Sequence, residues 1–399
     1  MEEESMSEWK EVRLGDIVTV KSGYAYKGKY ISNKGKNILL GMGCVSYNDK
    51  FLYSGARAYD EDCDERYCAK AGDIVLATRQ QSDSLPILAM PAIIPDSLFD
   101  KKIIVGTNLY LIKNDSDIDN HFLFWLLKTP NYVNYISSVK TGTTVRMVTK
   151  KDVENYTFNC PSKEERDTIS NILWGIDAKI ETNNKLNEKL EEMAQAIFKS
   201  WFVDFEPFKD KPFHETELGM IPEGWEVKNI DHLYDIKYGN NLSTSEIKKS
   251  GQYPVYGANG VIGYYDVSNC NDYSVLITSR GNGSGDVYRT HSSKSYVTNN
   301  SFIVKPKSNY SWIELSYIYY SFLNINFKSY TNGSAQPQLT NKSIHNIDIL
   351  LPTKKEIQNF CNLTMPIVYN IELLMRENDR LASLRDTLLP RLMSGELIV

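Results

Sequence analysis

Two stretches of the chain carry apolar residues that step alternately by three and four positions, which is the heptad pattern of long paired helices. In the first stretch, this seam holds Ile169, Leu173, Ile176, Ile180, Asn183, Asn187, Leu190, Ala194, Ile197 and Trp201. In the second stretch, it holds Phe360, Thr364, Ile367, Ile371, Leu374, Asn378, Leu381, Arg385, Leu388 and Leu392. Asn187 and Asn378 occupy equivalent seam positions, and a polar seam residue can fix the register of a helix pair. We therefore predict that the two helices pair, the alternative being that these asparagines face solvent.

The rest of the chain has the texture of strands and turns. Runs rich in Val, Ile and Tyr, such as residues 16–20, 73–77 and 109–113, alternate with clusters of Gly, Asn, Ser and Asp. The predicted fold class is α+β. It comprises two tandem mixed α/β globular domains, each followed by a long helix, with the two helices pairing as an antiparallel coiled coil.

An internal repeat supports this division of the chain. The segment from Thr141 to Glu181 returns 191 residues later without a gap, so that Gly142 corresponds to Gly333 and Thr149 to Thr340. Further upstream the offset is 216, as for Gly23 and Gly239. The chain is therefore predicted to hold two copies of one unit, the second shorter than the first.

Both predicted helices end in apolar clusters. The first ends in IFKSWFVDFEPF and the second in LLPRLMSGELIV. Large apolar side chains gathered at one place need a surface to bury against. We interpret them as partner-binding residues, the alternative being that they belong to an intramolecular core. The residues concerned are Ile197, Trp201, Phe202, Phe205, Leu388 and Leu392.

Composition narrows the class of protein. With 42% hydrophobic and 24% charged residues, the chain is typical of a soluble globular protein, and no apolar run is long enough to cross a bilayer. The acidic start has no apolar core typical of a signal peptide, so we expect a cytoplasmic protein. Six cysteines without a C-x-x-C pair favour reduced thiols over a zinc site.

The net charge of −5 argues by itself against a nucleic-acid partner, but the charge is unevenly distributed. Residues 162–223 hold fourteen Asp or Glu against eight Lys or Arg, whereas residues 236–310 hold eight Lys or Arg against four acids. Within the globular parts, the clusters YKGKY, VRMVTKK and SRGNGSGDVYR mix cationic, amide and aromatic residues with glycine. Such clusters contact phosphates and base edges, and they recur at equivalent places in the two copies.

Catalytic motifs are missing from the sequence. RGNGSGD does not match a phosphate-binding loop, and neither H-E-x-x-H nor a nucleophile elbow with a plausible triad occurs. Asp96, Asp100, Lys101 and Lys102 superficially suit a metal-dependent nuclease, but the second copy has no counterpart. We predict no catalytic residue and no metal ligand. The alternatives are a stand-alone nuclease or methyltransferase, which should show carboxylates or a cofactor loop, and a coiled-coil scaffold that binds no DNA.

Two further motifs are ELGMIPEGWEVKNIDHL and YPVYGANGVIGYYD. Together with the repeat and the helix-end motifs, they resemble the specificity subunit of a type I restriction-modification enzyme, over nearly the whole chain. The resemblance implies target recognition domains at residues 1–163 and 226–354, spacer helices at 164–206 and 355–399, and a linker at 207–225. It implies a non-catalytic subunit that binds a bipartite double-stranded DNA site, one half per domain. It also implies two modification subunits with S-adenosylmethionine that methylate adenine N6, restriction subunits with ATP and Mg²⁺, and no membrane.

The expected DNA-binding residues are the polar, cationic and aromatic ones in the recurring loops. In the first copy they are Tyr24, Lys27, Lys29, Arg79, Gln80, Ser82, Thr143, Arg146 and Lys150. In the second copy they are Tyr238, Asn240, Asn241, Tyr256, Asn259, Arg280, Asn282, Ser284, Ser334, Gln336 and Gln338.

Overall fold

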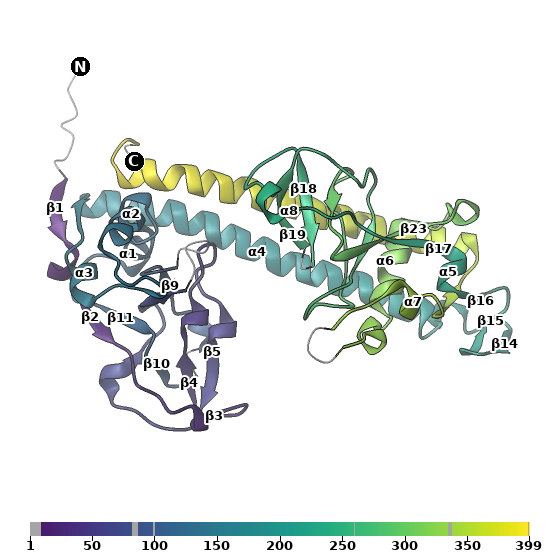
Figure 1. Ribbon diagram of the computed structural model, residues 1–399, viewed down its shortest axis with the longest axis horizontal. Helices are drawn as coiled ribbons and strands as arrows, with labels where there is room; N and C mark the ends of the chain where they lie inside the picture. The colour runs from purple at the N-terminus through teal and green to yellow at the C-terminus, as the bar shows by residue number, and fades with distance from the viewer. Residues whose placement is uncertain (1–8, 82–86, 99, 259, 334–336, 398) are drawn as a thin grey trace, which may run out of the picture. The chain divides into compact units, whose positions relative to one another are not determined.

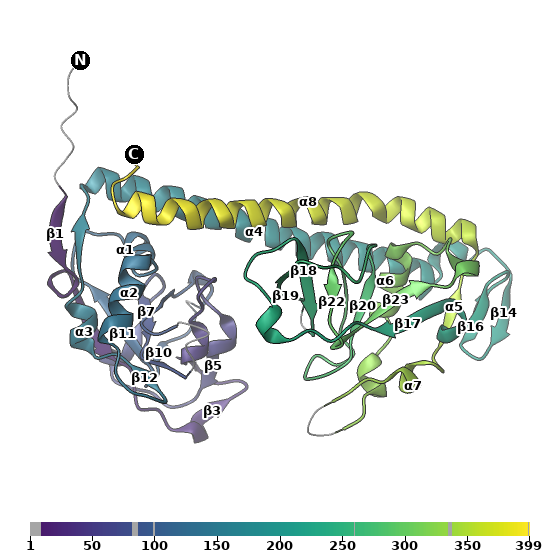
Figure 2. The same cartoon turned by 45° about the horizontal axis from the view of Figure 1, so that its top comes forward.

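The computed structural model describes residues 9–81, 87–98, 100–258, 260–333, 337–397 and 399. The chain divides into two compact units, one of residues 1–181 with 378–399 and the other of residues 182–377. Two 40-residue helices, α4 (Lys163–Phe202) and α8 (Lys354–Met393), each contribute one part to the first unit and one part to the second. Figures 1 and 2 show α4 and α8 side by side.

In the first unit, the helices other than α4 and α8 are α1 (Asn120–Leu126), α2 (Pro130–Val139) and α3 (Lys150–Glu154). Its strands are β1 (Lys10–Arg13), β2 (Val18–Ser22), β3 (Ile31–Ser32), β4 (Asn37–Leu40), β5 (Ala56–Tyr59), β6 (Cys68–Ala69), β7 (Ile74–Ala77), β8 (Arg79–Gln80), β9 (Pro91–Ile93), β10 (Ile103–Val105), β11 (Leu109–Asn114), β12 (Arg146–Met147) and β13 (Thr157–Cys160). The three runs expected as strands are thus confirmed as β2, β7 and β11.

In the second unit, the shorter helices are α5 (Ile230–Leu233), α6 (Leu315–Leu323) and α7 (Asn341–Ile344). Its strands are β14 (Phe213–Thr216), β15 (Gly219–Pro222), β16 (Glu226–Asn229), β17 (Tyr234–Tyr238), β18 (Tyr253–Gly257), β19 (Gly260–Tyr265), β20 (Val275–Thr278), β21 (Val287–Arg289), β22 (Tyr296–Val297), β23 (Ser301–Pro306) and β24 (Asp348–Leu351). The hairpin β14–β15 lies within the stretch expected as a linker.

The two units share one sheet topology, which confirms the internal repeat. A four-stranded sheet has the order β2-β11-β7-β9 in the first unit and β17-β23-β20-β21 in the second. In both sheets all neighbouring strands are antiparallel. The central strands β7 and β20 are buried at every position, and neither shows the alternation of apolar and polar residues that is typical of a strand with one face in solvent. A two-stranded pair also recurs, β1 with β13 and β16 with β24.

The repeated glycines Gly23 and Gly239 are explained by a close approach of two backbone segments. A Cβ atom added to Gly23 would lie 2.0 Å from the carbonyl oxygen of Gly106, and one added to Gly239 would lie 2.2 Å from that of Val297. The residue after each glycine then forms a parallel bridge, Tyr24 with Gly106 and Asn240 with Thr298. Only glycine fits at these two positions.

The helices α4 and α8 pair antiparallel in both units. In the first unit, Arg385 of α8 donates to Asp177 of α4 over 2.8 Å. In the second unit, Asn183 of α4 donates to Glu377 of α8 over 2.8 Å. Residue numbers therefore rise along α4 as those of the contacting residues fall along α8, as the seam predicted.

The seam differs in detail from the heptad pattern. Within α4, Asp177 and Phe198 are buried, whereas the predicted seam residues Ile176 and Ile197 beside them are only half-buried. Asp177 forms an ion pair with Arg385 of α8, and Phe198 packs into the core of the second unit. The predicted polar contact also moves by one turn, because Asn183 makes the interhelical hydrogen bond. The Oδ1 atom of Asn187 is buried without a hydrogen-bond partner among the described residues.

The aromatic cluster at the end of α4 lies in the core of the second unit, which corrects its interpretation as a partner-binding surface. Phe202 is 3% exposed, and its ring centroid is 5.1 Å from Phe360 of α8 and 5.7 Å from Trp225. Trp201 and Phe205 are half-buried and pack against the same cluster, as does Ile197. Sequence separation hides this arrangement, since the partners are supplied by distant segments.

The end of α8 is likewise part of a core, in this case that of the first unit. Leu392 is 2% exposed, and Leu388 is half-buried against the same cluster, which includes Ile169 and Leu173 of α4. Both predicted helix-end clusters therefore stabilise the units from within.

The ion pair of Asp177 and Arg385 gives a test of the helix pairing. Both side chains are largely buried, at 7% and 13% exposure, so Asp177→Ala leaves a buried guanidinium with Asp386 as its remaining partner. We expect a loss of about 3 kcal/mol in the free energy of unfolding, measured by urea denaturation. Lys189→Ala, which breaks the exposed pair with Glu192, is the control and should cost less than about 1 kcal/mol. Equal losses would contradict a stabilising role for the buried pair.

Candidate nucleic-acid interface

The two copies carry the same hairpin loop at the position of the recurring motif. Thr141 forms an antiparallel bridge with Met147, and Asn332 forms one with Gln338. Each residue of the second bridge lies 191 positions after its counterpart in the first, which is the offset of the repeat. The second residue of each loop is a glycine with a left-handed backbone, Gly142 at φ 90° and Gly333 at φ 89°, which a side chain would strain. The repeat thus preserves the bridge that closes each loop and the glycine that follows its first residue.

The helix after each hairpin fixes where the loop ends. Thr149 and Thr340 are the N-cap residues of α3 and α7, and each forms a reciprocal capping box with the third residue of its helix. Such a cap satisfies backbone N–H groups that the first turn leaves unpaired. In the first unit, α3 also carries Lys150, which is exposed beside the loop.

In the first unit, a second segment pairs with this hairpin. β8 and β12 form an antiparallel ribbon in which Gln80 lies opposite Arg146 and Arg79 opposite Met147. Arg79 and Thr143 are exposed, whereas Arg146 is half-buried and donates from Nη1 to the carbonyl oxygen of Gly142. We call the segments 79–80 and 141–147 the first loop pair.

In the second unit, the equivalent segments also pair. Arg280 forms an antiparallel bridge with Gln338, and the backbone N–H of Leu339 donates to the carbonyl oxygen of Ser279 over 2.8 Å. Arg280 and Asn282 are exposed, and Gln338 is half-buried. We call the segments 279–284 and 332–338 the second loop pair. Each loop pair therefore presents one exposed arginine, Arg79 or Arg280, directly after a central strand of the four-stranded sheet.

A second group of predicted residues in the first unit is held by Glu61. Its carboxylate accepts hydrogen bonds from Tyr59 at 2.9 Å, Tyr24 at 3.0 Å and Lys27 at 3.3 Å. These bonds, that from Tyr59 first, hold the pKa of Glu61 below its usual value. A phosphate that approaches Lys27 must therefore compete with Glu61. Lys29 is exposed, with Nζ 4.8 Å from the ring centroid of Tyr30.

The corresponding group in the second unit is more open. Asn240 and Asn241 are exposed, and Asn240 follows Gly239 at the bridge to Thr298. Tyr238 is half-buried, with its ring centroid 4.3 Å from that of Phe302. The two asparagines can donate and accept hydrogen bonds at a base edge, whereas the face of Tyr238 is largely covered.

Three predicted contact residues are buried and serve the loops instead. Gln80 is 4% exposed, and its Oε1 accepts from the backbone N–H of Leu88. Ser284 and Tyr256 are each 2% exposed, and they bond to the carbonyl oxygen of Ser279 and to the backbone N–H of His291. We predicted that these three side chains contact DNA, but because they are buried they stabilise the loops instead. Ser82, Asn259, Ser334 and Gln336 lie outside the described residues.

Sequence reasoning overlooked two exposed aliphatic side chains. Val261 and Ile262, 50% and 47% exposed, follow the turn between β18 and β19. That turn is anchored, because Thr278 donates to the carbonyl oxygen of Ala258 over 2.6 Å. The predicted contact residues are polar, cationic or aromatic, although aliphatic groups also contact the methyl group of thymine. The signal available in the sequence was the pair of aliphatic residues directly after a glycine turn.

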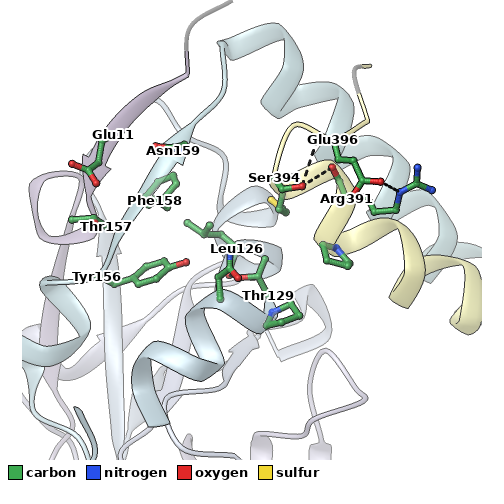
Figure 3. Close-up of a pocket in the computed structure, with 14 residues that line it drawn as sticks. Glu11, Leu126, Thr129, Tyr156, Thr157, Phe158, Asn159, Arg391, Ser394 and Glu396 are labelled. Atoms are coloured by element: carbon green, nitrogen blue, oxygen red, sulfur yellow. Dashed lines mark hydrogen bonds and ion pairs between the residues drawn. The ribbon is translucent and has the colours of Figure 1, made fainter. Parts of the chain in front are cut away.

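The first unit has a hollow of about 620 Å³ whose lining does not resemble a catalytic site. Leu126, Phe158 and Tyr156 contribute to one side and the end of α8 to the other (Figure 3). Two of its ionic groups are engaged with each other, since Arg391 donates to Glu396 over 2.7 Å. In the parts of the chain that the structure describes, no group of three or more His, Cys, Asp or Glu side chains could hold a metal ion.

The helices expose apolar residues on the side away from their pairing. In the second unit, Met365, Tyr369 and Leu373 of α8 are 62%, 59% and 42% exposed and follow each other at four-residue spacing, so they share one face. Met193 of α4 and Leu384 of α8, equivalent in the repeat, are also exposed, at 54% and 48%. Within the described residues, no helix is long and apolar enough to cross a membrane.

Comparisons with known proteins agree with this architecture. Residues 6–192 and 222–378 match the family model described as type I restriction modification DNA specificity domain. The chain is 25% identical to the type I restriction enzyme HindI specificity subunit of Haemophilus influenzae, over 98% of this chain and 100% of that protein. It is 27% identical to the MjaIX specificity subunit of Methanocaldococcus jannaschii, over 70% of this chain and 69% of that protein.

A solved structure shows the same fold. The crystal structure of the S subunit of a type I restriction-modification system from M. genitalium matches with a TM-score of 0.55 and 16% identity, over 98% of each chain. Since the family model covers both copies of the repeat, the chain belongs to the family of type I restriction-modification DNA specificity proteins.

Proposed function

We propose that the chain is the sequence-specific DNA-recognition subunit of a type I restriction-modification complex, and that each unit reads one half of a bipartite target. The observation that carries this proposal is the recurrence of one loop pair, with an exposed arginine at the same place, in both units. Its partner subunits supply the chemistry, since the relatives are named specificity subunits.

The loop pairs suit base recognition for a physical reason. A two-stranded ribbon with its connecting loops is narrow enough to enter the major groove, where each base pair presents a distinct pattern of donors and acceptors. A guanidinium can bind the two acceptors of guanine, and an amide can bind adenine in the same bidentate way. Arg79 supplies the first group in one unit, and Arg280 with Asn282 supplies both groups in the other.

Substitution of the two arginines tests the division of labour. Arg280→Ala should remove about 1–3 kcal/mol of discrimination at one position of one half-site, and Arg79→Ala should do the same in the other half. Binding is measured on duplexes that vary one half-site at a time. Arg57→Ala, which removes an exposed arginine of β5, is the matched control and should leave sequence preference unchanged.

Two outcomes would contradict this role of the arginines. If either arginine only anchors a phosphate, affinity falls equally for all sequences and the salt dependence becomes shallower by about one unit of slope. If the change for Arg280→Ala spreads over both half-sites, the modular reading of the target is wrong.

We propose further that α4 and α8 set the number of unread base pairs between the half-sites. Both helices continue from one unit into the other, so the helix pair connects the two units. Pairing can make such a connection stiffer than a single helix. A helix rises about 1.5 Å per residue, so a change of helix length translates directly into distance.

Insertion of one heptad after Asn183 and one after Arg376 tests this spacer. The two sites face each other across the pair, because Asn183 bonds to Glu377, so every seam position keeps its partner. Seven residues add about 10 Å, which corresponds to about three base pairs. A map of methylated sites should show unchanged half-site bases and a longer gap. An unchanged gap with altered half-site bases would contradict the spacer role of the helices.

The apolar helix faces are proposed to dock the modification subunits. Because Phe202 is buried and the half-buried Trp201 and Phe205 pack against the same core, we propose the exposed stripe of Met365, Tyr369 and Leu373 as the docking surface instead. The equivalent exposed positions Met193 and Leu384 support two subunits, one for each copy of the repeat. The restriction subunits, with ATP and Mg²⁺, then join this assembly, and S-adenosylmethionine is bound by the modification subunits.

Met365→Ser combined with Tyr369→Ser should weaken assembly with the modification subunit by several kcal/mol while the melting temperature of the isolated protein changes little, because both side chains are exposed. Size-exclusion chromatography with mass measurement gives the stoichiometry. Val267→Ser, which removes a 56% exposed apolar residue outside the helices, serves as the control. Unchanged assembly would place the docking surface elsewhere.

A further inference from the structure

Two cysteines of the first unit lie within contact distance of each other. The Sγ atoms of Cys63 and Cys68 are 3.7 Å apart, on either side of the single helical turn formed by Glu65–Tyr67. Both residues are half-buried, whereas the other four cysteines, Cys44, Cys160, Cys270 and Cys361, are buried as free thiols. A disulfide has a sulfur–sulfur distance of about 2.0 Å, so the two sulfur atoms must come about 1.7 Å closer to form the bond.

Cys68 also lines a hollow of about 460 Å³ that carries more lysines than carboxylates. The lysines are Lys70, Lys101, Lys102 and Lys113, and the carboxylates are Glu65 and Asp100. Lys102 and Lys113 are paired with Glu65 and Asp73. Lys101 donates to the carbonyl oxygen of Gly35, a neutral group that leaves its charge available. Asp62 and Asp64, on either side of Cys63, are paired with Lys36 and Arg66, so the lysines that line the hollow attract an anionic molecule to Cys68.

The two thiols differ in reactivity. Burial, followed by the hydrogen bond to Cys68, raises the pKa of the Cys63 thiol to about 12. A thiol with such a pKa holds almost no thiolate at neutral pH and is a poor first nucleophile. Cys68 lines the hollow whereas Cys63 does not, so Cys68 is the residue that meets an incoming reagent.

From these observations we propose that Cys63 and Cys68 form a reversible dithiol–disulfide site that reacts with anionic low-molecular-weight disulfides of the glutathione type. The Cys68 thiolate attacks one sulfur of the reagent, whose sulfur–sulfur bond breaks, and a mixed disulfide forms as one thiol leaves. Cys63 then attacks the Cys68 sulfur and releases the second thiol. The protein dithiol is oxidised, the reagent is reduced to two thiols, and these carry away the two protons.

A metal site fits these residues less well. A structural zinc ion takes four ligands, and within the described residues no third His, Cys, Asp or Glu joins the pair in an arrangement that could hold a metal. Two thiols beside a basic hollow match the chemistry of disulfide exchange instead.

The site is connected to candidate DNA-binding residues, a consequence that rests on the proposed function. The ring centroid of Tyr67, in the turn between the two cysteines, is 5.4 Å from that of Tyr24. Glu61, which holds Tyr24 and Lys27, lies two residues before Cys63. A disulfide closes the turn into a small ring next to these contacts, so oxidation would act on the half-site read by the first unit alone.

The chemistry is tested without DNA, so its failure is distinct from a failure of the proposed function. The full-length protein is incubated with oxidised glutathione, quenched with an alkylating reagent and examined by mass spectrometry. Wild type should acquire a Cys63–Cys68 disulfide. Cys63→Ser should stop at glutathione bound to Cys68, whereas Cys68→Ser should react at Cys63 at least about tenfold more slowly, as expected for a thiol with little thiolate. The four buried cysteines should be alkylated only after denaturation, which verifies folding of each variant.

The role of the basic hollow is tested with a charge reversal. Lys70→Glu should slow the reaction with glutathione disulfide about threefold or more and leave the reaction with the neutral 2-hydroxyethyl disulfide unchanged. Lys249→Glu, an exposed lysine of the second unit, is the matched control and should alter neither rate.

Three results would overturn the proposal. They are a wild type in which Cys68 becomes modified but no Cys63–Cys68 bond forms, a folded protein that does not react, and a Cys68→Ser variant that reacts as fast as Cys63→Ser. Equal slowing of charged and neutral reagents by Lys70→Glu would remove the anion preference from the site.

Discussion

The pairing of α4 with α8 is the constraint on which both units depend. A 40-residue helix rich in charged residues gains most of its stability from the apolar stripe that it buries. Here that stripe is shared, because Ile169 and Leu173 enter the core of the first unit while Phe198 and Phe202 enter that of the second. Neither globular core is complete without residues from the long helices, so the fold of each unit and the pairing of the helices are parts of one interaction.

Buried polar contacts give this pairing its register. An apolar seam alone allows helices to slip by a heptad, since every seam position then meets another of the same kind. Asp177 with Arg385 and Asn183 with Glu377 remove this freedom, because slippage would leave a buried charge or amide without its partner. The polar residues of the seam thus determine alignment, and the apolar residues at its ends complete the core of each unit.

Much of the architecture could be predicted from the sequence because it is carried by periodic or repeated signals. The heptad seam predicted the antiparallel helices, and the repeat predicted two copies of one domain. The family itself was identified from motifs. The positions of Trp201 and Phe202 could not be obtained in this way, because a cluster of aromatics shows only that burial is needed. The partners Trp225 and Phe360 come from other parts of the chain, and only the fold places them there.

The candidate interface shows the same limit at the level of single side chains. Gln80 and Arg79 are neighbours in sequence, yet one is buried and the other exposed, because successive residues of a strand point to opposite faces. The sequence identifies the loop but not which of its polar residues faces outward, and that face is decided by strand pairing over a long separation. The four predicted contacts outside the described residues remain predictions.

The buried polar residues of the loops have a consequence for recognition. Gln80 bonds to the backbone of Leu88, and Ser284 to that of Ser279, so these buried side chains tie the segments beside Arg79 and Arg280 to the backbone before a ligand is met. A loop that is already ordered loses less conformational entropy on binding, and more of its contact energy is available for discrimination between bases. The exposed residues beside them, Arg79 and Arg280, contribute little to this support and can be exchanged without disturbing it. The buried side chains thus support the backbone, and under the proposed function the exposed ones are left to determine base preference, so that one scaffold can carry different contact residues in its two halves.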